Sequence, residues 1–356
     1  MIKRFSPPVL ASLALAAAAL LCTPAFASHH FETAIVLKQT ALNQLDNFVF
    51  QSSRPGYTAF VMTVNSAPKA GPGGVFAQDA LYNIHVAKDA GIKAGYTFSL
   101  AFSADQFSVY ELDEANGAVG AMGRKIGSVA IGNKEGASFD GIKVWAGAIK
   151  DPFYGNSPGL HVFRDQLEKG IFEPGVWKSV QGANIFNGRS AGAIVVEVPN
   201  SLLGTDVKVF MTTALKDAAG HWTQVQYSAN PLFSHAMLYA MESLKTEHDR
   251  SRPGMDDDLR NIVAASATRA STLAKSQADP LAYGDKVARM LMPDVLSYKI
   301  GSKAEFSNTR RNGRALDDDA MSAMLTLLIG APTDQAIANP KLYTAEFPYV
   351  MPVELK

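Results

Sequence analysis

Two histidines and two carboxylates near the start of the chain have the residue types that hold metal ions. His29, His30 and Glu32 lie within four residues, and Asp46 follows at the start of a predicted strand. Imidazole nitrogens and carboxylate oxygens are common ligands of Zn²⁺ and related divalent ions. These four residues therefore form a candidate metal site, with capping of backbone amides at a turn as the favoured structural alternative.

The first 27 residues have the pattern of a signal peptide. Lys3 and Arg4 give a positive start, residues 9–21 are an apolar segment, and residues 25–27 end in the small-residue pattern Ala-Phe-Ala. The apolar segment is shorter than the roughly 20 residues that span a bilayer, which favours cleavage over a retained anchor. We therefore predict a periplasmic or secreted protein of residues 28–356, with no transmembrane segment after cleavage.

Cleavage after Ala27 would change the chemistry of the chain in two ways. It would remove Cys22, the single cysteine, and leave a mature chain without disulfides. It would also expose Ser28-His29-His30, whose terminal amine, two backbone amides and third-position imidazole can bind Cu(II) or Ni(II) in a square plane. An N-terminal segment with a purely structural role is the alternative that we favour. Lipidation of Cys22 is disfavoured, because Leu21 stands where lipoprotein signals have a small residue.

The charge balance argues against nucleic acids and anionic membranes as partners. The chain has 33 basic and 33 acidic residues, and removal of Lys3 and Arg4 leaves 31 against 33. Nucleic acids and anionic membranes bind concentrated basic faces that displace counterions. We expect no nucleic-acid partner, and instead an unknown small ligand or envelope protein.

The first two-thirds of the chain are predicted to form antiparallel β-sheets. Large apolar residues alternate with polar or small ones at residues 81–86 and 96–100, which is the period of a half-buried strand. Strands are expected at residues 46–50, 57–64, 80–86, 96–102, 107–112, 142–149, 193–198, 207–213 and 222–227. Residues 54–56 (Arg-Pro-Gly) predict a turn between the first two. The pattern indicates a sandwich-like arrangement.

Helices are expected from about residue 236 onward. The candidates are residues 236–248, 256–274, 280–292 and 317–329, where apolar residues recur at helical spacing or alanine is frequent. We predict an α+β fold in which residues 28–356 form a single β-rich domain with a helical C-terminal portion. Residues 151–189 interrupt the strands, contain a short helix candidate at 161–169, and are the predicted binding surface.

Other motifs have plain structural explanations. Residues 188–192 match the G-x-S-x-G pattern of hydrolases, but a strand follows Ser190 where that motif needs a helix. The aspartate runs at 256–258 and 317–319 lack the spacing of a calcium loop and suit helix starts. Residues 310–314, a basic turn, are expected to pair with Asp317–Asp319 rather than to bind an anion. No catalytic residues are assigned.

Several segments together resemble a family of exported bacterial proteins catalogued as domain of unknown function 4331. They are Ser28-His29-His30 with Glu32, Leu45-Asp46, residues 80–85, residues 151–154, residues 197–199, residues 230–232, Asn312-Gly313-Arg314 with Asp317-Asp318, and residues 347–349. The resemblance implies an exported protein without an assigned activity. Many relatives have an Asp-rich turn after the strand at 80–86, whereas this chain has Ala-Lys-Asp-Ala-Gly at 87–91, so calcium binding there is not expected.

Three functions fit these observations. We favour a non-enzymatic exported protein that binds a small ligand, a metal ion or a protein partner through residues 151–189 and the N-terminal segment. The first alternative is a metal-dependent enzyme that uses His29, His30, Glu32 and Asp46. The second is a structural envelope or stress protein with no small ligand.

Overall fold

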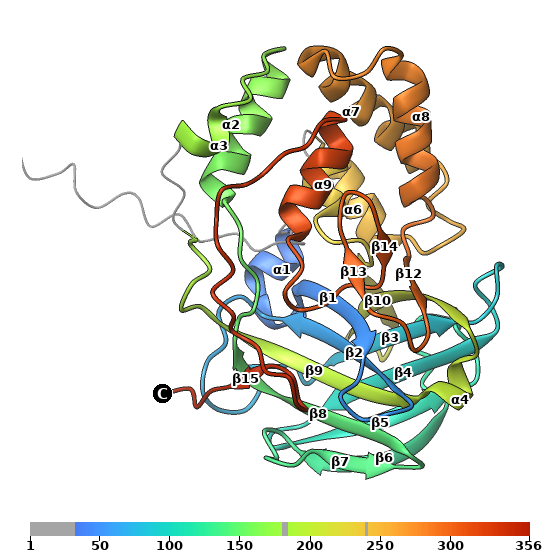
Figure 1. Cartoon of the computed structure of the whole chain (residues 1–356). Coiled ribbons are helices and arrows are strands. Elements are labelled where there is room, and N and C mark those ends of the chain that lie inside the picture. The colour runs from blue at the N-terminus through green and yellow to red at the C-terminus, as the bar shows by residue number, and fades with distance from the viewer. Residues whose placement is uncertain (1–32, 180–183, 239–240) are drawn as a thin grey trace, which may run out of the picture.

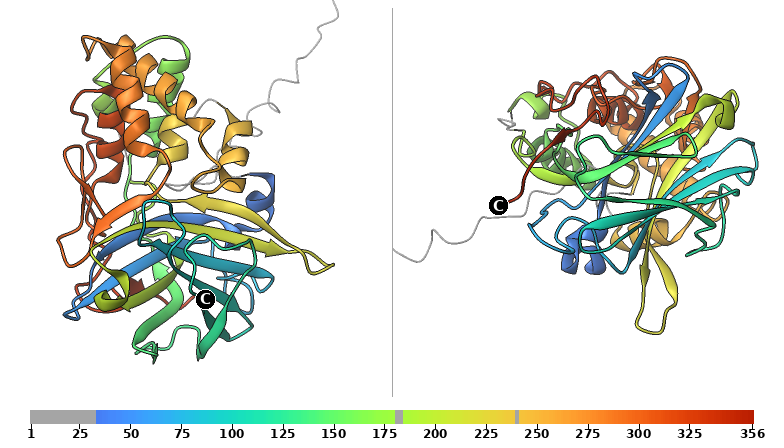
Figure 2. Two further views of the ribbon diagram at one scale, coloured as in Figure 1. Left: turned by 90° about the vertical axis from the view of Figure 1, so that its right-hand side faces the viewer. Right: turned by 90° about the horizontal axis from the view of Figure 1, so that it is seen from below.

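The computed structural model describes residues 33–179, 184–238 and 241–356, with helices gathered at one end of a β-rich body (Figure 1). The predicted signal peptide lies outside these residues, as do His29, His30 and Glu32. Figure 2 shows the helices and the β-rich body from the side and from below. The predicted α+β class is confirmed, because antiparallel sheets fill the first two-thirds of the chain and helices dominate the C-terminal third.

Two sheets make up the β-rich body, and every pairing between the described strands is antiparallel. Sheet A has the order β1 (Gln44–Gln51), β2 (Tyr57–Val64), β9 (Ser190–Pro199), β8 (Ile142–Lys150) and β15 (Met351–Pro352), with β7 (Ala137–Phe139) also on β8. Sheet B has the order β11 (Trp222–Ser228), β10 (Asp206–Lys216), β3 (Ala80–Ala87), β4 (Gly95–Phe102), β5 (Gln106–Leu112) and β6 (Arg124–Ala130). A further strand, β12 (Leu296–Lys299), pairs with the first residues of β10. The nine predicted strands are all present.

The helices that cover one end of the sheets come mainly from the last third of the chain. They are α5 (Phe233–Met237), α6 (Glu242–Arg250), α7 (Leu259–Ala274), α8 (Pro280–Leu291) and α9 (Ala320–Ile329). Earlier short helices are α1 (Ala34–Lys38), α2 (Ser157–Glu168), α3 (Val176–Ser179) and α4 (Asn200–Leu203). Aspartates begin two of these helices: the side chain of Asp279 accepts from the amide of Ala282 (3.0 Å), and that of Asp319 from Ser322 (3.0 Å).

One hydrophobic core joins the sheets and the helices. Tyr82, Ile84 and Val86 of β3 point into it, because alternate side chains of a strand share a face. Val195 of β9 and Met324 of α9 belong to the same core, so it joins both sheets and the helical layer.

The opposite face of β3 carries two polar side chains, Asn83 and His85, which are equally buried. His85 contacts the Thr97 hydroxyl (3.0 Å) and the Ala115 carbonyl oxygen (3.0 Å) through Nδ1, and the Thr212 hydroxyl (2.8 Å) through Nε2. Its ring stacks on that of Phe210, with centroids 4.3 Å apart. Burial lowers the pKa of His85 well below its ordinary value. His85 is therefore a neutral structural residue with both ring nitrogens engaged.

The prediction of one continuous helix over residues 236–248 is wrong. Two helices occupy this stretch, and Met241 between them has an extended backbone (φ −136°, ψ 93°). Its side chain is 38% exposed, whereas Met237 is buried. A shared apolar stripe therefore does not join α5 to α6.

Several strands were missed because they carry little apolar patterning. Strand β6 contains Arg124 and Lys125 and lies mostly exposed at the edge of sheet B. Strand β12 alternates between buried and exposed side chains but has only four residues. The pairs β13 (Glu305–Phe306) and β14 (Arg311–Asn312), which form a separate hairpin, are shorter still.

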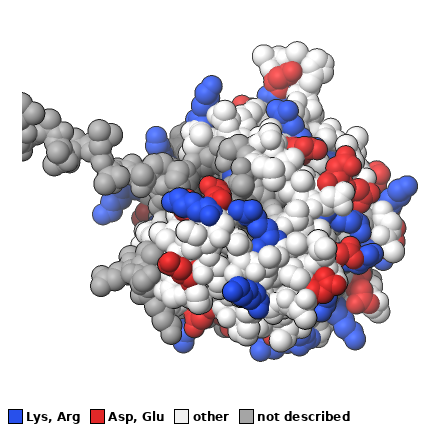
Figure 3. Space-filling view, turned by 90° about the horizontal axis from the view of Figure 1, so that it is seen from above, with Lys and Arg blue, Asp and Glu red and all other residues white. Residues whose placement is uncertain are grey.

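Figure 3 shows the molecule from the helical end, where basic and acidic side chains are interspersed over the described surface. None of the helices in the described part of the chain is long and apolar enough to cross a membrane.

Candidate functional site

Asp46, one of the four predicted metal ligands, is part of a buried ion pair. Nη1 of Arg314 donates to its carboxylate at 2.6 Å, and both side chains are almost completely buried. Two backbone hydrogen bonds of 3.0 Å between Val49 and Arg314 attach this arginine to β1. The predicted pairing of residues 310–314 with Asp317–Asp319 is therefore wrong: among the described residues, Arg314 pairs with Asp46 and Arg310 with Glu305.

The candidate metal site as a whole cannot be assembled from the described residues, because His29, His30 and Glu32 lie outside them. Within the described ranges, no three His, Cys, Asp or Glu side chains are arranged to hold a metal ion.

Other segments that carry the family resemblance also supply buried polar contacts. The Glu197 carboxylate in β9 accepts hydrogen bonds from the hydroxyls of Ser52 (2.5 Å) and Tyr349. The Asp294 carboxylate accepts from the backbone amide of Asn230 (2.9 Å) and lies 3.0 Å from Nε2 of His248. These contacts hold distant segments together, and they give each of these residues a structural role.

The predicted binding surface at residues 151–189 is closed at its base. Nε of Arg189 donates to the Asp151 carboxylate at 2.8 Å, and the backbone amide of Asp151 donates to the Arg189 carbonyl oxygen at 3.0 Å. The predicted helix at 161–169 is present as α2, which starts earlier, at Ser157. Asn156 caps it, because its side chain accepts from the amide of Gly159 at 2.9 Å.

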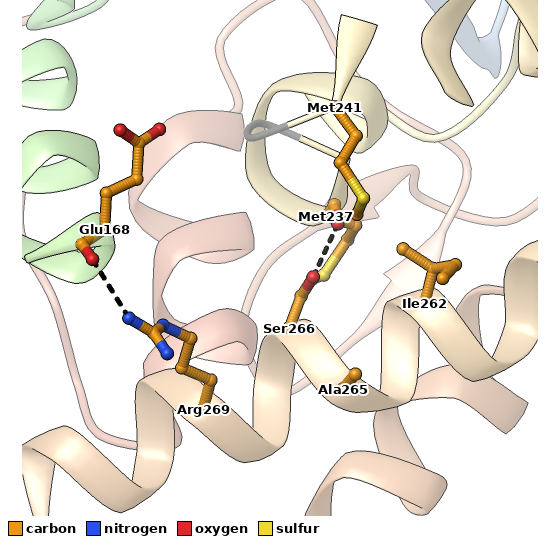
Figure 4. A pocket seen from close by; sticks show the side chains of 7 residues that line it. All are labelled: Glu168, Met237, Met241, Ile262, Ala265, Ser266 and Arg269. Atoms are coloured by element: carbon orange, nitrogen blue, oxygen red, sulfur yellow. Dashed lines mark hydrogen bonds between the residues drawn. The ribbon is translucent and has the colours of Figure 1, made fainter. Parts of the chain in front are cut away.

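A groove of about 340 Å³ lies where α2 meets α5 and α7 (Figure 4). Met237, Met241 and Ile262 give it a mostly apolar lining. Two of its polar side chains are engaged within the protein: Ser266 donates to the Met237 carbonyl oxygen (2.7 Å), and Arg269 donates to carbonyl oxygens at the end of α2. Only Glu168 comes from the predicted surface. The groove therefore offers apolar contact and few groups that would orient a ligand.

A second depression, of about 430 Å³, has a different chemistry, and we call it the basic cleft. Its charged lining residues are Lys88, Asp89, Asp206, Lys208, Lys299 and Arg311. They come from the end of β3 and its following loop, the start of β10, β12, and the β13–β14 hairpin. Four segments distant in sequence thus meet at one site.

The floor of the basic cleft follows from the register of three strands. Lys208 of β10 lies opposite Ala87 of β3 on one side and Ser297 of β12 on the other. Opposed residues of antiparallel strands share a face, and so do residues two apart. Lys208 and Lys299 therefore project from one face of the sheet, while Val207 on the other face is buried in the core.

Lysines hold the rim of the basic cleft. Nζ of Lys208 donates to the Ala90 carbonyl oxygen at 3.1 Å, and Nζ of Lys88 donates to that of Leu202 at 3.3 Å. Nζ of Lys88 also lies 4.5 Å from the ring centroid of Tyr96. Each ammonium has three donors, so both retain N–H groups for another partner.

The two carboxylates of the cleft differ in their hydrogen bonding. Asp89 accepts from the backbone amides of Gly91 (3.1 Å), Lys93 (2.9 Å) and Ala94 (2.9 Å). These amides, that of Lys93 first, lower the pKa of Asp89 and fix the loop that forms one wall. Asp206 is exposed and lies opposite Lys299 in the strand register.

Arg311 is a partly buried cation of the basic cleft. Its Nη1 is buried and has no hydrogen-bond partner among the described residues, and burial lowers the pKa of the guanidinium. None of the four cations forms an ion pair with a carboxylate of the described residues. An unpaired, partly desolvated guanidinium attracts an anion strongly.

The β13–β14 hairpin separates this cleft from an acidic one of about 440 Å³. The acidic cleft is lined by Glu305, Asp317, Asp318, Asp319 and Asp334. The Asp318 carboxylate accepts from the amides of Phe306 (2.8 Å) and Ala315 (2.7 Å), while Asp319 caps α9. Its best-placed carboxylates are therefore used by the backbone.

Sequence reasoning missed the basic cleft, since its cations are scattered over more than 220 positions and none forms a motif. Residues 310–314 gave the only sequence indication, and there the anion-binding alternative was the one set aside.

The hydrolase-like pattern at residues 188–192 is explained by the fold. Strand β9 begins at Ser190 and continues to Pro199, so the helix that this motif requires is absent from these residues.

Comparison with known proteins adds no relative: no family model, curated protein or solved structure matches the chain.

Proposed function

We propose that this chain is an exported binding protein that takes up a small anionic ligand in the basic cleft and catalyses no reaction on it. One observation carries the proposal: four cations from separate segments line one cleft without a carboxylate partner among the described residues. The predicted signal peptide supports export, and the resemblance to the family of domain of unknown function 4331 agrees with it.

The dimensions of the cleft support a small molecule as the ligand. Its volume of about 430 Å³ falls within the range of ligand sites in proteins. Lys208 and Lys299 stand on a sheet, and Asp89 fixes the loop beside them. Rigid elements of this kind lower the entropic cost of binding.

Binding without catalysis fits the residues that line the cleft. They include neither histidine nor cysteine, and the two carboxylates stand among cations. The buried pair of His248 and Asp294, which has the side-chain types of a catalytic dyad, lies in the core: both side chains are at most 2% exposed. The cations of the cleft can bind and orient an anion, and this role requires no proton transfer.

The test measures melting of the purified mature protein in a buffer free of phosphate. Phosphate, sulfate, citrate and acetate are compared with glucose and CaCl₂ at equal ionic strength. Anions that bind the folded state must raise the melting temperature, whereas glucose should not. Added NaCl should weaken the effect, because exposed charges are screened within about 10 Å at 0.1 M salt.

Two matched variants locate the binding site. Lys299→Gln removes an exposed strand lysine of the cleft, and Lys125→Gln removes one from the edge strand β6. We expect the first to weaken anion binding severalfold and the second to leave it unchanged. Absence of stabilisation by every anion would overturn the proposal, as would equal effects of the two substitutions.

A further inference from the structure

We infer that the ligand of the basic cleft carries a doubly charged phosphate group on a small polar body. The inference rests on the proposed function and narrows it to one chemical class. The first step is charge: four cations and two carboxylates give the cleft a formal charge of +2. A dianion neutralises that charge completely, and a phosphate monoester carries nearly two negative charges at pH 7.

The second step is the donor geometry at Arg311. A guanidinium presents its N–H groups in a planar fork that matches two oxygens of one phosphate or carboxylate group. In this chain Arg311 lines the cleft without a carboxylate partner among the described residues, and β12 beside the hairpin supplies the hydroxyl of Ser297 and the ammonium of Lys299. A tetrahedral group offers three oxygens to such a set of donors, one more than a carboxylate.

The third step concerns the rest of the ligand. The apolar side chains that line the basic cleft are small: Ala87, Ala90 and Val207, the last of which is 2% exposed. Tyr298 is also 2% exposed, and its hydroxyl donates to the Ser302 carbonyl oxygen (2.5 Å). No broad apolar platform for a lipid chain or an aromatic base is therefore present on the described walls. The body attached to the phosphate should be compact and polar.

Calorimetric titration of the mature protein provides the test, with glycerol 3-phosphate as the probe. Succinate, a dianion without phosphate, and acetate, a monoanion, are the comparison ligands. We expect glycerol 3-phosphate to bind at least tenfold more tightly than either. Equal or tighter binding of succinate or acetate would overturn the phosphate inference while leaving anion binding intact. Failure of all anions would overturn the proposed function itself.

A pH series gives a second, independent readout. The second pKa of a phosphate monoester is near 6, so its dianion fraction falls about tenfold between pH 7.5 and pH 5. The affinity for glycerol 3-phosphate should fall by about the same factor. Sulfate stays dianionic over this range and controls for titration of the protein, including the cleft carboxylates Asp89 and Asp206 and the nearby Asp318. Parallel losses for both ligands would overturn the inference.

The role of Arg311 is tested by a conservative substitution with a control on the same hairpin. Arg311→Lys keeps the charge but removes the planar fork, and it should weaken glycerol 3-phosphate binding about tenfold. Arg310→Lys alters an exposed neighbour that contacts Glu305 at 3.8 Å and should have no effect. Equal affinities in Arg311→Lys and the unaltered protein would rule out the fork. Lys299→Gln, whose exposed side chain is not needed for the fold, covers the case in which Arg311→Lys does not fold.

Discussion

Arg314 contacts Asp46 across 268 positions of sequence, and this buried pair helps to hold the start of β1. The guanidinium also lies 4.3 Å from the ring centroid of Phe48. Neither partner stands near the other in any sequence pattern, so the pairing could not be predicted. A carboxylate near two histidines indicated metal chemistry because sequence proximity was the only available guide.

Removing one partner of this pair should be costly. In Asp46→Ala the guanidinium stays buried without its counter-charge, which typically costs about 3–5 kcal/mol. We expect a loss of that size in the free energy of unfolding, measured with urea. Asp285→Ala breaks an ion pair whose side chains are 67% and 54% exposed, and it should cost under about 1 kcal/mol. Similar losses in the two variants would contradict the structural role of Asp46.

The raised pKa of Asp318 predicts that the stability of the fold depends on pH. Burial raises its pKa to about 6, above the ordinary value near 3.9, so the folded protein binds this proton more tightly than the unfolded chain does. The stabilisation is therefore complete below about pH 4 and is lost as the pH rises through 6. The two pKa values set its upper limit at about 3 kcal/mol.

Asp318→Asn tests this dependence, because both backbone amides donate to a single carboxylate oxygen that an amide oxygen can replace. Between pH 4.5 and pH 7.5 the variant should lose less unfolding free energy than the unaltered protein. An identical pH profile for the two proteins would show that Asp318 does not titrate in this range.

Cleavage of the signal peptide after Ala27 can be tested directly. Mass spectrometry of the exported protein should find Ser28 as its first residue. If the histidines there hold copper, nickel or zinc, elemental analysis should find one metal ion per chain, and His30→Ala should remove it. A metal-free protein in metal-supplemented medium would leave the N-terminal segment with its structural role alone.

At the scale of elements, α7 and α8 pack closely enough to depend on one glycine. A Cβ on Gly284 would lie 2.1 Å from Oγ1 of Thr268 and 2.4 Å from the carbonyl oxygen of Ala264. Gly284→Ala should therefore destabilise the fold by about 1–3 kcal/mol through overpacking. Gly175→Ala is the control, since its Cβ would meet nothing within 4 Å. Equal urea midpoints for the two variants would show that the helices can separate without cost.

Element prediction succeeded for long apolar segments and failed for short or exposed ones. Strand β2 occupies the predicted residues 57–64, all but the first of which are buried. Strand β6 has mostly exposed side chains, so its sequence contains no comparable apolar segment. The break at Met241 is a backbone feature, and the helical spacing of methionine and leucine around it concealed that break.

At the scale of the whole molecule, a shared core should make unfolding cooperative. Core residues from both sheets and from α5, α7, α8 and α9 form one connected cluster. We expect one calorimetric transition whose van't Hoff and calorimetric enthalpies agree. Two transitions would contradict the predicted single domain and would indicate that the helical layer melts separately.

The fold class was predictable from the sequence, but the strand order was not. Alternation identifies a strand without naming its neighbour, and β10 pairs with β3, β11 and β12, which are separated from it by very different lengths of chain. The basic cleft depends on that order, because Lys208 and Lys299 share a face only through the β10–β12 pairing. A site created by sheet topology leaves no local pattern in the sequence.

The closed base of residues 151–189 has a consequence for protein engineering and for evolution. Strands β8 and β9 are adjacent and antiparallel, and Lys150 lies opposite Ser190 at their ends. A turn of two residues can connect such strands. The helices α2 and α3 are thus an elaborated hairpin loop, but Leu160, Phe163 and Trp177 pack into the shared core. A lineage could exchange this module, or an engineer could graft a foreign domain here, only if the replacement covers the apolar surface that these side chains now bury.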